Sequence, residues 1–168
     1  VKPDKGVITI NTLFISPGYP AEMADFTRGL AQCGARVIGL GEHPVNSLSW
    51  TVKQSLADYL CVPSLVDTNA VLAAVRQKAA HTPIDRVECL WEPGMLLAAR
   101  LREALGLPGM TVAETVPFRD KSRMKEVLDA AGIEVMGLIA GLGVVRFPEL
   151  LSRMHAATKA SGAAFGLV

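Results

Sequence analysis

The sequence predicts an α/β protein with a mostly parallel sheet and helices on both of its faces. Short apolar runs rich in β-branched residues alternate along the chain with segments whose apolar residues recur every three or four positions. Half of the 168 residues are hydrophobic and only 20% are charged, so a globular fold is expected. Strands that alternate with helices favour βαβ units, in which neighbouring strands run parallel.

Four apolar runs have the composition of strands. The first, V-I-T-I-N-T-L-F-I-S, is followed by P-G-Y-P, which is typical of a tight loop. The predicted strands are residues 7–16, 36–40, 59–62 and 86–91. A further short edge segment is expected at residues 112–116, before the last helix of the pattern.

Helices are predicted between these strands. Asp67 is suited to cap one of them, and Gly106 to end another. The helices are expected at residues 21–33, 49–57, 67–80 and 95–105. In the first of these, the helical period places Met23, Phe26, Leu30 and Cys33 on one face, which is expected to be buried.

Ligands of open parallel sheets bind beyond the carboxyl ends of the strands. This rule indicates the loops after Ser16, Leu40, Val62 and Trp91. The first loop lacks G-x-G-x-x-G, so a dinucleotide-binding fingerprint is absent. Glu92 is either a ligand-facing carboxylate or a negative charge at the start of the helix that begins at Met95. Tyr19 either stacks on a ligand or covers the edge of the sheet, and we favour the second role.

The cysteines and histidines show no metal-binding pattern. The three cysteines lie far apart without a C-x-x-C pair, which excludes a typical zinc site and a disulfide framework. Cys61 and Cys89 lie in apolar runs and are expected to be buried in the core, with Cys33 as the third reduced thiol. No metal ligand is therefore assigned.

Charge and hydropathy exclude several classes of protein. The formal net charge is +1, which gives no support to nucleic-acid binding. No apolar run reaches the length of about 18 residues that a membrane span needs. The start, V-K-P-D-K-G, lacks the apolar region of a signal peptide, so a cytoplasmic protein is expected. It also lacks an initiator Met, which is compatible with a fragment or a processed chain.

Residues 115–132 are predicted to enter and form an amphipathic helix. Asp120 or Ser122 can cap its start and Gly132 can end it. Its apolar face consists of Met124, Val127, Leu128 and Ala131. Four cations crowd its beginning, namely Arg119, Lys121, Arg123 and Lys125. Since a helix start favours anions, this is either a phosphate site or a solvated basic face.

The segment F-R-D-K-S-R-M-K-E-V-L-D-A-A-G-I resembles the opening of the ATP-grasp domain in carboxylate ligases of the carbamoyl-phosphate synthetase and biotin carboxylase type. In that family a D-K pair precedes a helix that ends in A-G-[IV], and here the pair falls on Asp120 and Lys121. The resemblance extends over residues 12–133. It implies a Rossmann-like pre-ATP-grasp domain at residues 1–117 and the start of an ATP-grasp domain at 118–168.

The resemblance also implies a function. The expected protein is a fragment of an ATP-dependent carboxylate–amine or carboxylate–thiol ligase that works through an acyl phosphate and uses ATP and Mg²⁺. Lys121 would bind the ATP phosphates and Glu92 the substrate, whereas no catalytic residue is assigned. The implied partners are a small-molecule carboxylate and an amine, without nucleic acid or membrane, and a homodimer is compatible. The alternatives are a stand-alone flavodoxin-like binding or regulatory module and a non-catalytic interaction domain.

The predicted grasp segment departs from the family after Ile133. Neither the P-x-P-R segment nor the V-V-K-P strand with a second nucleotide lysine follows Ile133. A weak helix is expected at residues 147–160, and no Glu and Asn pair for Mg²⁺ is visible. We therefore expect a truncated or frameshifted ligase that does not catalyse alone, with an ordered core that ends near Gly132.

Overall fold

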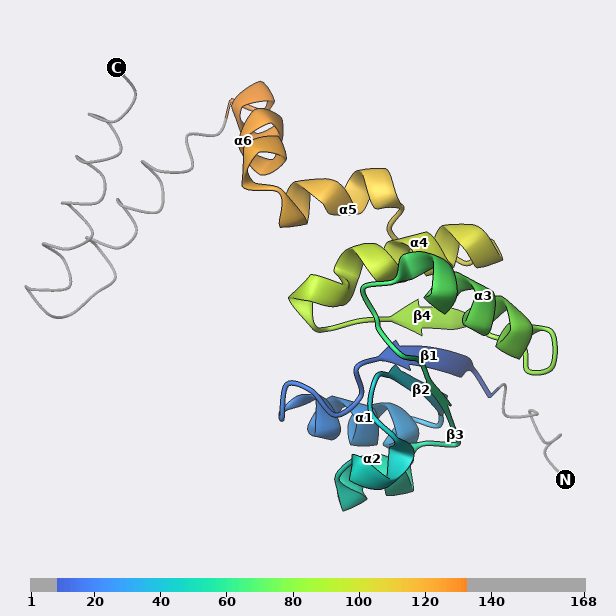
Figure 1. Cartoon of the computed structure of the whole chain (residues 1–168). Coiled ribbons are helices and arrows are strands. Elements are labelled where there is room, and N and C mark those ends of the chain that lie inside the picture. Colours follow the sequence, from blue (N-terminus) through green and yellow to red (C-terminus); the bar gives the residue numbers. More distant parts are fainter. Residues whose placement is uncertain (1–8, 133–168) are drawn as a thin grey trace, which may run out of the picture. The chain divides into compact units, whose positions relative to one another are not determined.

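The computed structural model describes residues 9–132 of the chain (Figure 1). The chain divides into two compact units, Val1–Arg119 and Asp120–Val168, which are described separately below. The beginning of the first predicted strand lies outside the described residues. The predicted helix at 147–160 also lies outside the described residues. The expectation that the ordered core ends near Gly132 concerns residues that the structure does not describe.

The first unit contains a sheet of four strands in the order β3-β2-β1-β4, and every pair of neighbours is parallel. The strands are β1 (Asn11–Ile15), β2 (Arg36–Gly41), β3 (Asp58–Cys61) and β4 (Arg86–Glu88). Leu13 of β1 lies opposite Ile38 on one side and Val87 on the other. The predicted parallel α/β fold is therefore confirmed, although β1 and β4 are shorter than their apolar runs.

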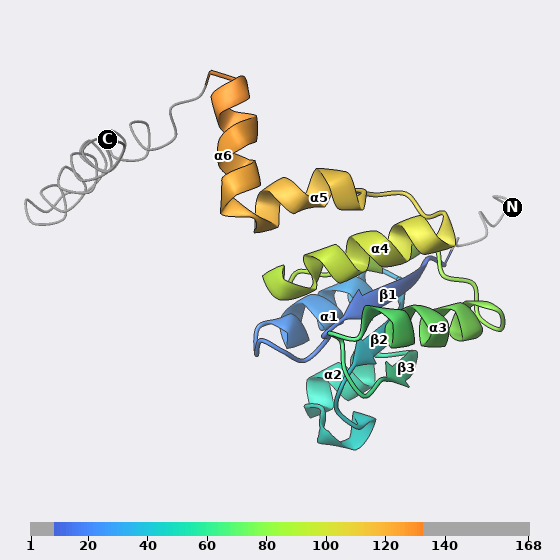
Figure 2. The ribbon, with the colours of Figure 1, turned by 45° about the horizontal axis from the view of Figure 1, so that its top comes forward.

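Helices cover both faces of the sheet (Figures 1 and 2). On one face lie α1 (Met23–Gln32) and α2 (Trp50–Ser55), and on the other lie α3 (Thr68–Ala79) and α4 (Met95–Leu105). Two short 3₁₀ helices, η1 (Val45–Ser47) and η2 (Glu92–Gly94), occupy loops that the sequence left without regular structure. All helices within residues 9–132 are too short or too polar to cross a membrane.

The larger core lies between the sheet and helices α3 and α4. Successive residues of a strand point to opposite faces, so Leu13 and Ile15 of β1 both face this core. They pack with Val71 and Val75 of α3 and with Leu101 of α4, all of which are fully buried. Each such side chain contributes about 1.5–3 kcal/mol by burial, which makes this layer the main source of stability.

The smaller core lies on the face covered by α1, and it corrects one prediction. Phe14 packs there with Met23 of α1, but Phe26 is 50% exposed and Cys33 is also exposed. Thr27 is the fully buried residue of α1 instead, and its hydroxyl lies 2.7 Å from the Pro17 carbonyl oxygen. A hydrogen-bonded threonine can occupy a buried position at little cost. The buried face of α1 is therefore rotated from the one that the apolar residues predicted.

Several helix ends follow the predicted local signals. The Asp67 side chain accepts a hydrogen bond from the Ala70 N–H at 3.0 Å and caps α3. Gly106 ends α4 with φ +65°, a conformation that glycine adopts without strain. These predictions are confirmed because capping depends on residues close in sequence.

The edge segment predicted at 112–116 is wrong, because these residues belong to helix α5 (Val112–Arg119). Glu114 accepts hydrogen bonds from the Thr111 N–H at 2.8 Å and the Thr111 hydroxyl at 2.9 Å, while the Glu114 N–H donates to the hydroxyl at 3.2 Å. This reciprocal T-x-x-E arrangement is a capping box. It starts a helix that the β-branched residues alone did not indicate.

The second unit begins with helix α6 (Lys121–Ala130). Asp120 is its N-cap, and its carboxylate accepts from the N–H groups of Ser122 at 2.8 Å and Arg123 at 3.1 Å. Gly132 follows the helix with φ +68°. The predicted cap and stop are both confirmed. The predicted apolar face of α6 is not buried: Met124 and Val127 are exposed.

Candidate functional site

The strand order places a switch point between β1 and β4. From β1 the chain builds outward through β2 to β3, and β4 then adds on the other side of β1. In parallel sheets ligands bind beyond the carboxyl ends of the strands where the order reverses. The loops that follow β1 and β4 therefore form the candidate site of this unit.

The loop after β1 is held in one conformation by Ser16. This residue has φ +56°, a left-handed value that is uncommon for a residue with a side chain. Its N–H donates to the Leu40 carbonyl at 2.8 Å, and its hydroxyl donates to the Tyr19 carbonyl at 2.7 Å. The two bonds fix the strand end and the loop that presents Tyr19.

Tyr19 and Trp91 meet at the switch point. Their ring centroids are 5.8 Å apart and their planes make an angle of 79°, which is an edge-to-face contact. Tyr19 is 63% exposed, so most of its ring surface remains open to solvent. The pair joins the two loops that follow β1 and β4, and it presents aromatic surface to solvent.

Cys89 and Gly94 support Trp91 from inside the loop. The Cys89 thiol donates to the Trp91 carbonyl at 3.1 Å, and the Gly94 N–H donates to the same oxygen at 3.0 Å. A Cβ at position 94 would lie 2.6 Å from the Cys89 sulfur, so the loop requires glycine there. Burial raises the pKa of the Cys89 thiol, which makes it a poor nucleophile.

Glu92 lies at the start of η2, just beyond β4, and it is not a free carboxylate. Its Oε1 accepts a hydrogen bond from Nη1 of Arg119, the last residue of α5, at 2.5 Å. The Glu92 side chain is 68% exposed and that of Arg119 31% exposed. The ion pair fastens the end of α5 to the ligand-facing edge. The sequence did not predict Arg119 in this role, because only the missed capping box of α5 could have indicated its position.

Lys121 is the first residue of α6 and is exposed, as the sequence predicted. Two other cations of the helix are paired within it, Arg123 with Glu126 and Lys125 with Asp129, both at 2.5 Å. Within residues 9–132 Lys121 forms no ion pair. Glu92 and Lys121 belong to different units, and each is therefore assigned to a site separately.

The cysteine predictions are partly wrong. Cys61 is the last residue of β3, which is an edge strand, and its side chain is exposed. Its thiol lies 3.7 Å from the Glu42 carbonyl oxygen. An apolar run indicates a strand but does not tell an edge strand from a central one. Cys89 is half-buried, and all three cysteines are free. Among residues 9–132 no group of three His, Cys, Asp or Glu side chains is placed to hold a metal ion.

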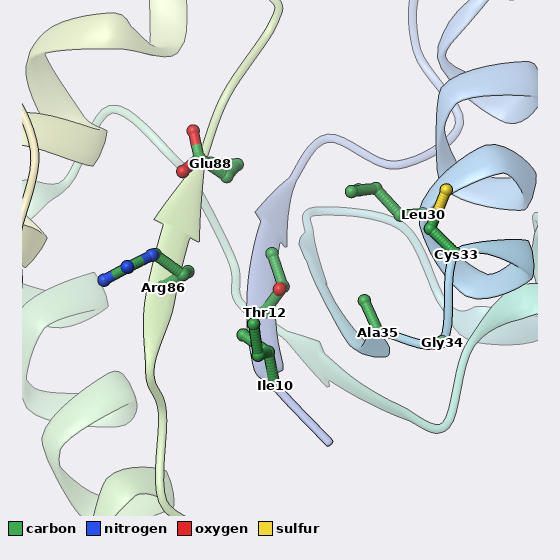
Figure 3. Close-up of a pocket in the computed structure, with 8 residues that line it drawn as sticks. All are labelled: Ile10, Thr12, Leu30, Cys33, Gly34, Ala35, Arg86 and Glu88. Atoms are coloured by element: carbon green, nitrogen blue, oxygen red, sulfur yellow. The ribbon is translucent and has the colours of Figure 1, made fainter. Parts of the chain in front are cut away.

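A pocket of about 390 Å³ lies away from the strand-end loops (Figure 3). It opens between the end of α1 and the strands β1 and β4, where α1 leaves part of the sheet uncovered. Its lining consists of Ile10, Thr12, Leu30, Cys33, Gly34, Ala35, Arg86 and Glu88. Glu88 is already paired with Arg102 at 3.3 Å, and this region lacks convergent polar groups that would orient a ligand. The strand-end loops are therefore the better candidate.

The fold and its strand-end loops define a Rossmann-like α/β domain. Residues 34–109 match the family model of the ATP-grasp N-terminal domain, which confirms the resemblance for this segment. Residues 131–168 match a different family model, a Na⁺/H⁺ antiporter subunit, and they lie almost wholly outside the described residues.

Comparison with solved structures gives an L-amino acid ligase from Bacillus licheniformis, with a TM-score of 0.60 and 22% sequence identity. The match covers 74% of this chain but only 30% of the ligase chain. At this identity the likeness shows a shared fold. A search among curated proteins gives no match.

Proposed function

We propose that this chain supplies the N-terminal domain of an ATP-dependent ligase that joins a carboxylate to an amine or a thiol. The observation that carries the proposal is the match of residues 34–109 to the ATP-grasp N-terminal domain. The fold shared with an amino-acid ligase supports it and suggests amino acids as substrates. In this proposal residues 1–117 form the pre-ATP-grasp domain, the ATP-grasp domain begins at residue 118, and the protein works in the cytoplasm.

The proposed reaction has two steps. A substrate carboxylate oxygen attacks the terminal phosphorus of ATP, which gives an acyl phosphate and releases ADP. The amine or thiol then attacks the acyl carbon, and inorganic phosphate leaves. Mg²⁺ belongs to the proposal through the family resemblance alone. The donor groups within residues 9–132 do not fit a metal ion, so we assign no step to it.

Lys121 is the proposed contact to the ATP phosphates. The free N–H groups of a helix start usually contribute to such sites, but Asp120 already accepts from those of Ser122 and Arg123. The contribution of α6 therefore rests on the exposed ammonium of Lys121, which would neutralise charge on the transferred phosphoryl group.

Glu92 is the proposed substrate contact at the switch point. Its position beyond β4 and its 68% exposed side chain support this role. The pair with Arg119 holds the carboxylate in one orientation and offsets its charge. Glu92 is thus better suited to accept a hydrogen bond from a substrate than to attract a free cation.

A graft tests the proposal. Residues 1–132 would be joined to the remaining part of the L-amino acid ligase, and ATP binding measured by calorimetry. We expect Lys121→Ala to weaken binding by about 1–3 kcal/mol, the range for a hydrogen bond to a charged group. Lys125→Ala is the matched control, because that ammonium is already paired with Asp129.

Two results would contradict the assignment. Unchanged affinity in Lys121→Ala together with lost affinity in Lys125→Ala would place the phosphate contact elsewhere on α6. An unchanged affinity in both variants would show that the basic start of α6 is only a solvated face.

A further inference from the structure

We propose that Tyr19 and Trp91 form the contact surface for an apolar, preferably aromatic, side chain of the substrate. This inference rests on the proposed function, which defines the substrate only as a carboxylate and an amine or thiol. It adds the class of side chain that the site selects and the two residues that select it.

The two rings lie where a ligand is expected. Tyr19 belongs to the loop after β1 and Trp91 to the loop after β4, and these strands are neighbours in the sheet. The order of strands reverses between them, and this is where ligands of parallel sheets bind. The edge-to-face contact of the two rings therefore lies at the point where the topology predicts a ligand.

Hydrogen bonds hold the backbone of both loops. Ser16 fixes the Tyr19 carbonyl through its hydroxyl at 2.7 Å, in a backbone conformation that is costly for a serine. The Trp91 carbonyl accepts from both the Cys89 thiol and the Gly94 N–H. These bonds hold the backbone at Tyr19 and Trp91, so the two loops lose little conformational freedom when a ligand binds, which favours affinity.

The exposed surface of the pair is aromatic. Tyr19 is 63% exposed although it contacts Trp91, so ring surface remains available to a further partner. The neighbouring charge of Glu92 is offset by Arg119, which leaves the site without a strong field. An aromatic surface without net charge favours an apolar or aromatic group, which can join the edge-to-face pair.

The surface of the two rings is small. A stable protein interface buries about 800 Å² on each partner, far more than two side chains can offer. An amino-acid side chain or another small apolar group matches the surface of two rings. The structure therefore favours a small molecule over a protein as the occupant.

The experiment uses the full 168-residue chain and the emission of Trp91. The chain has two tryptophans, and Trp50 is 72% exposed, so Trp50→Phe leaves Trp91 as the sole reporter with little effect on folding. L-phenylalanine and L-alanine would be titrated separately, with calorimetry as the second measurement. We expect phenylalanine to change the Trp91 emission and to bind about tenfold more tightly than alanine, the size of an aromatic contact.

Variants assign the preference to the ring pair. Tyr19→Ala should abolish the preference for phenylalanine, whereas Tyr19→Phe, which keeps the ring, should retain it. Phe26→Ala is the control, because Phe26 is also an exposed aromatic residue, at 50%, but belongs to α1. The Phe26→Ala variant should keep the same preference for phenylalanine over alanine as the parent chain.

Equal affinity for the two amino acids, no saturable change with either, or a preference that survives Tyr19→Ala would overturn the inference. The measurement needs no ATP, so it separates the two proposals. If the unmutated graft does not bind ATP while the 168-residue chain still prefers phenylalanine, the proposed function alone is refuted. If the graft binds ATP as expected while the chain shows no preference for phenylalanine, the inference about Tyr19 and Trp91 alone is refuted.

Discussion

Arg119 donates a hydrogen bond to Glu92 at 2.5 Å and so connects the end of α5 to the loop after β4. The two residues are 27 positions apart. Arg119 is also the last residue of the first unit, and Lys121 stands two positions further along the chain. The pair therefore ties the residues that precede α6 to the ligand-facing edge of the sheet.

Removal of this pair should loosen α5 rather than unfold the domain. Arg119→Met is expected to change the free energy of unfolding by about 1 kcal/mol or less, as for other exposed pairs, while amide hydrogen exchange in α5 becomes faster. Exchange measured by mass spectrometry on peptides from α5 and β1 distinguishes the two effects.

Arg123→Met is the control for Arg119→Met. It removes the same charge from a pair that lies within α6 and should leave exchange in α5 unchanged. Faster exchange in β1 as well as in α5 would show that Arg119 stabilises the whole domain, and would contradict the expectation that only α5 is loosened.

The capping box makes the order of α5 dependent on pH. Hydrogen bonds from the Thr111 N–H and hydroxyl lower the pKa of Glu114 below 4.5 in the folded protein. The stabilisation is therefore complete above the unfolded pKa, near 4.5, and is lost as pH falls through the folded pKa. Exchange in α5, corrected for the intrinsic pH dependence, should rise in this window.

Glu114→Gln removes the titrating group and serves as the comparison. In this variant the corrected exchange of α5 should no longer respond to pH in that window. An identical pH response in both proteins would assign the effect to another carboxylate.

Gly94→Ala should destabilise the site. The new Cβ would lie 2.6 Å from the Cys89 sulfur, on a short side chain that has little room to move. Overpacking of this kind costs about 1–3 kcal/mol, measurable by urea denaturation. Gly29→Ala is the matched control: its Cβ meets nothing within 4 Å in the middle of α1, so a gain of about 0.5–1 kcal/mol is expected.

A second substitution tests the cause of this loss. If the clash with sulfur is responsible, Cys89→Ala combined with Gly94→Ala should recover part of the stability relative to Gly94→Ala alone. Purely additive losses in the double variant would mean that the backbone at position 94, and not the clash, requires glycine.

The three cysteines should react with iodoacetamide at two different rates. Cys33 and Cys61 are exposed and should be modified quickly in the native protein. Cys89 is half-buried and burial raises its pKa, so little thiolate is present near pH 8 and its modification should be slow. Peptide mass analysis gives the rates. Rapid modification of Cys89 would contradict its half-buried position, and fewer than three modified thiols after denaturation would contradict the free cysteines.

Apart from α5, the sequence by itself determined the order of the main helices and strands and most of their ends. Asp67, Asp120 and Gly106 act on backbone groups within a few positions, so their roles can be read without the fold. The alternation of apolar runs and helical segments likewise determined the parallel α/β class, because each pattern reflects local backbone geometry. The location of Glu92 beyond a strand end followed from the same pattern.

Only the tertiary structure decided which side chains meet. Thr27 replaces Phe26 in the core because the Pro17 carbonyl is there to accept its hydroxyl. Tyr19 reaches Trp91 because β1 and β4 pair side by side, and Arg119 reaches Glu92 because α5 forms where an edge segment was predicted. Such contacts join residues far apart in sequence, and a local period carries no information about the distance between them.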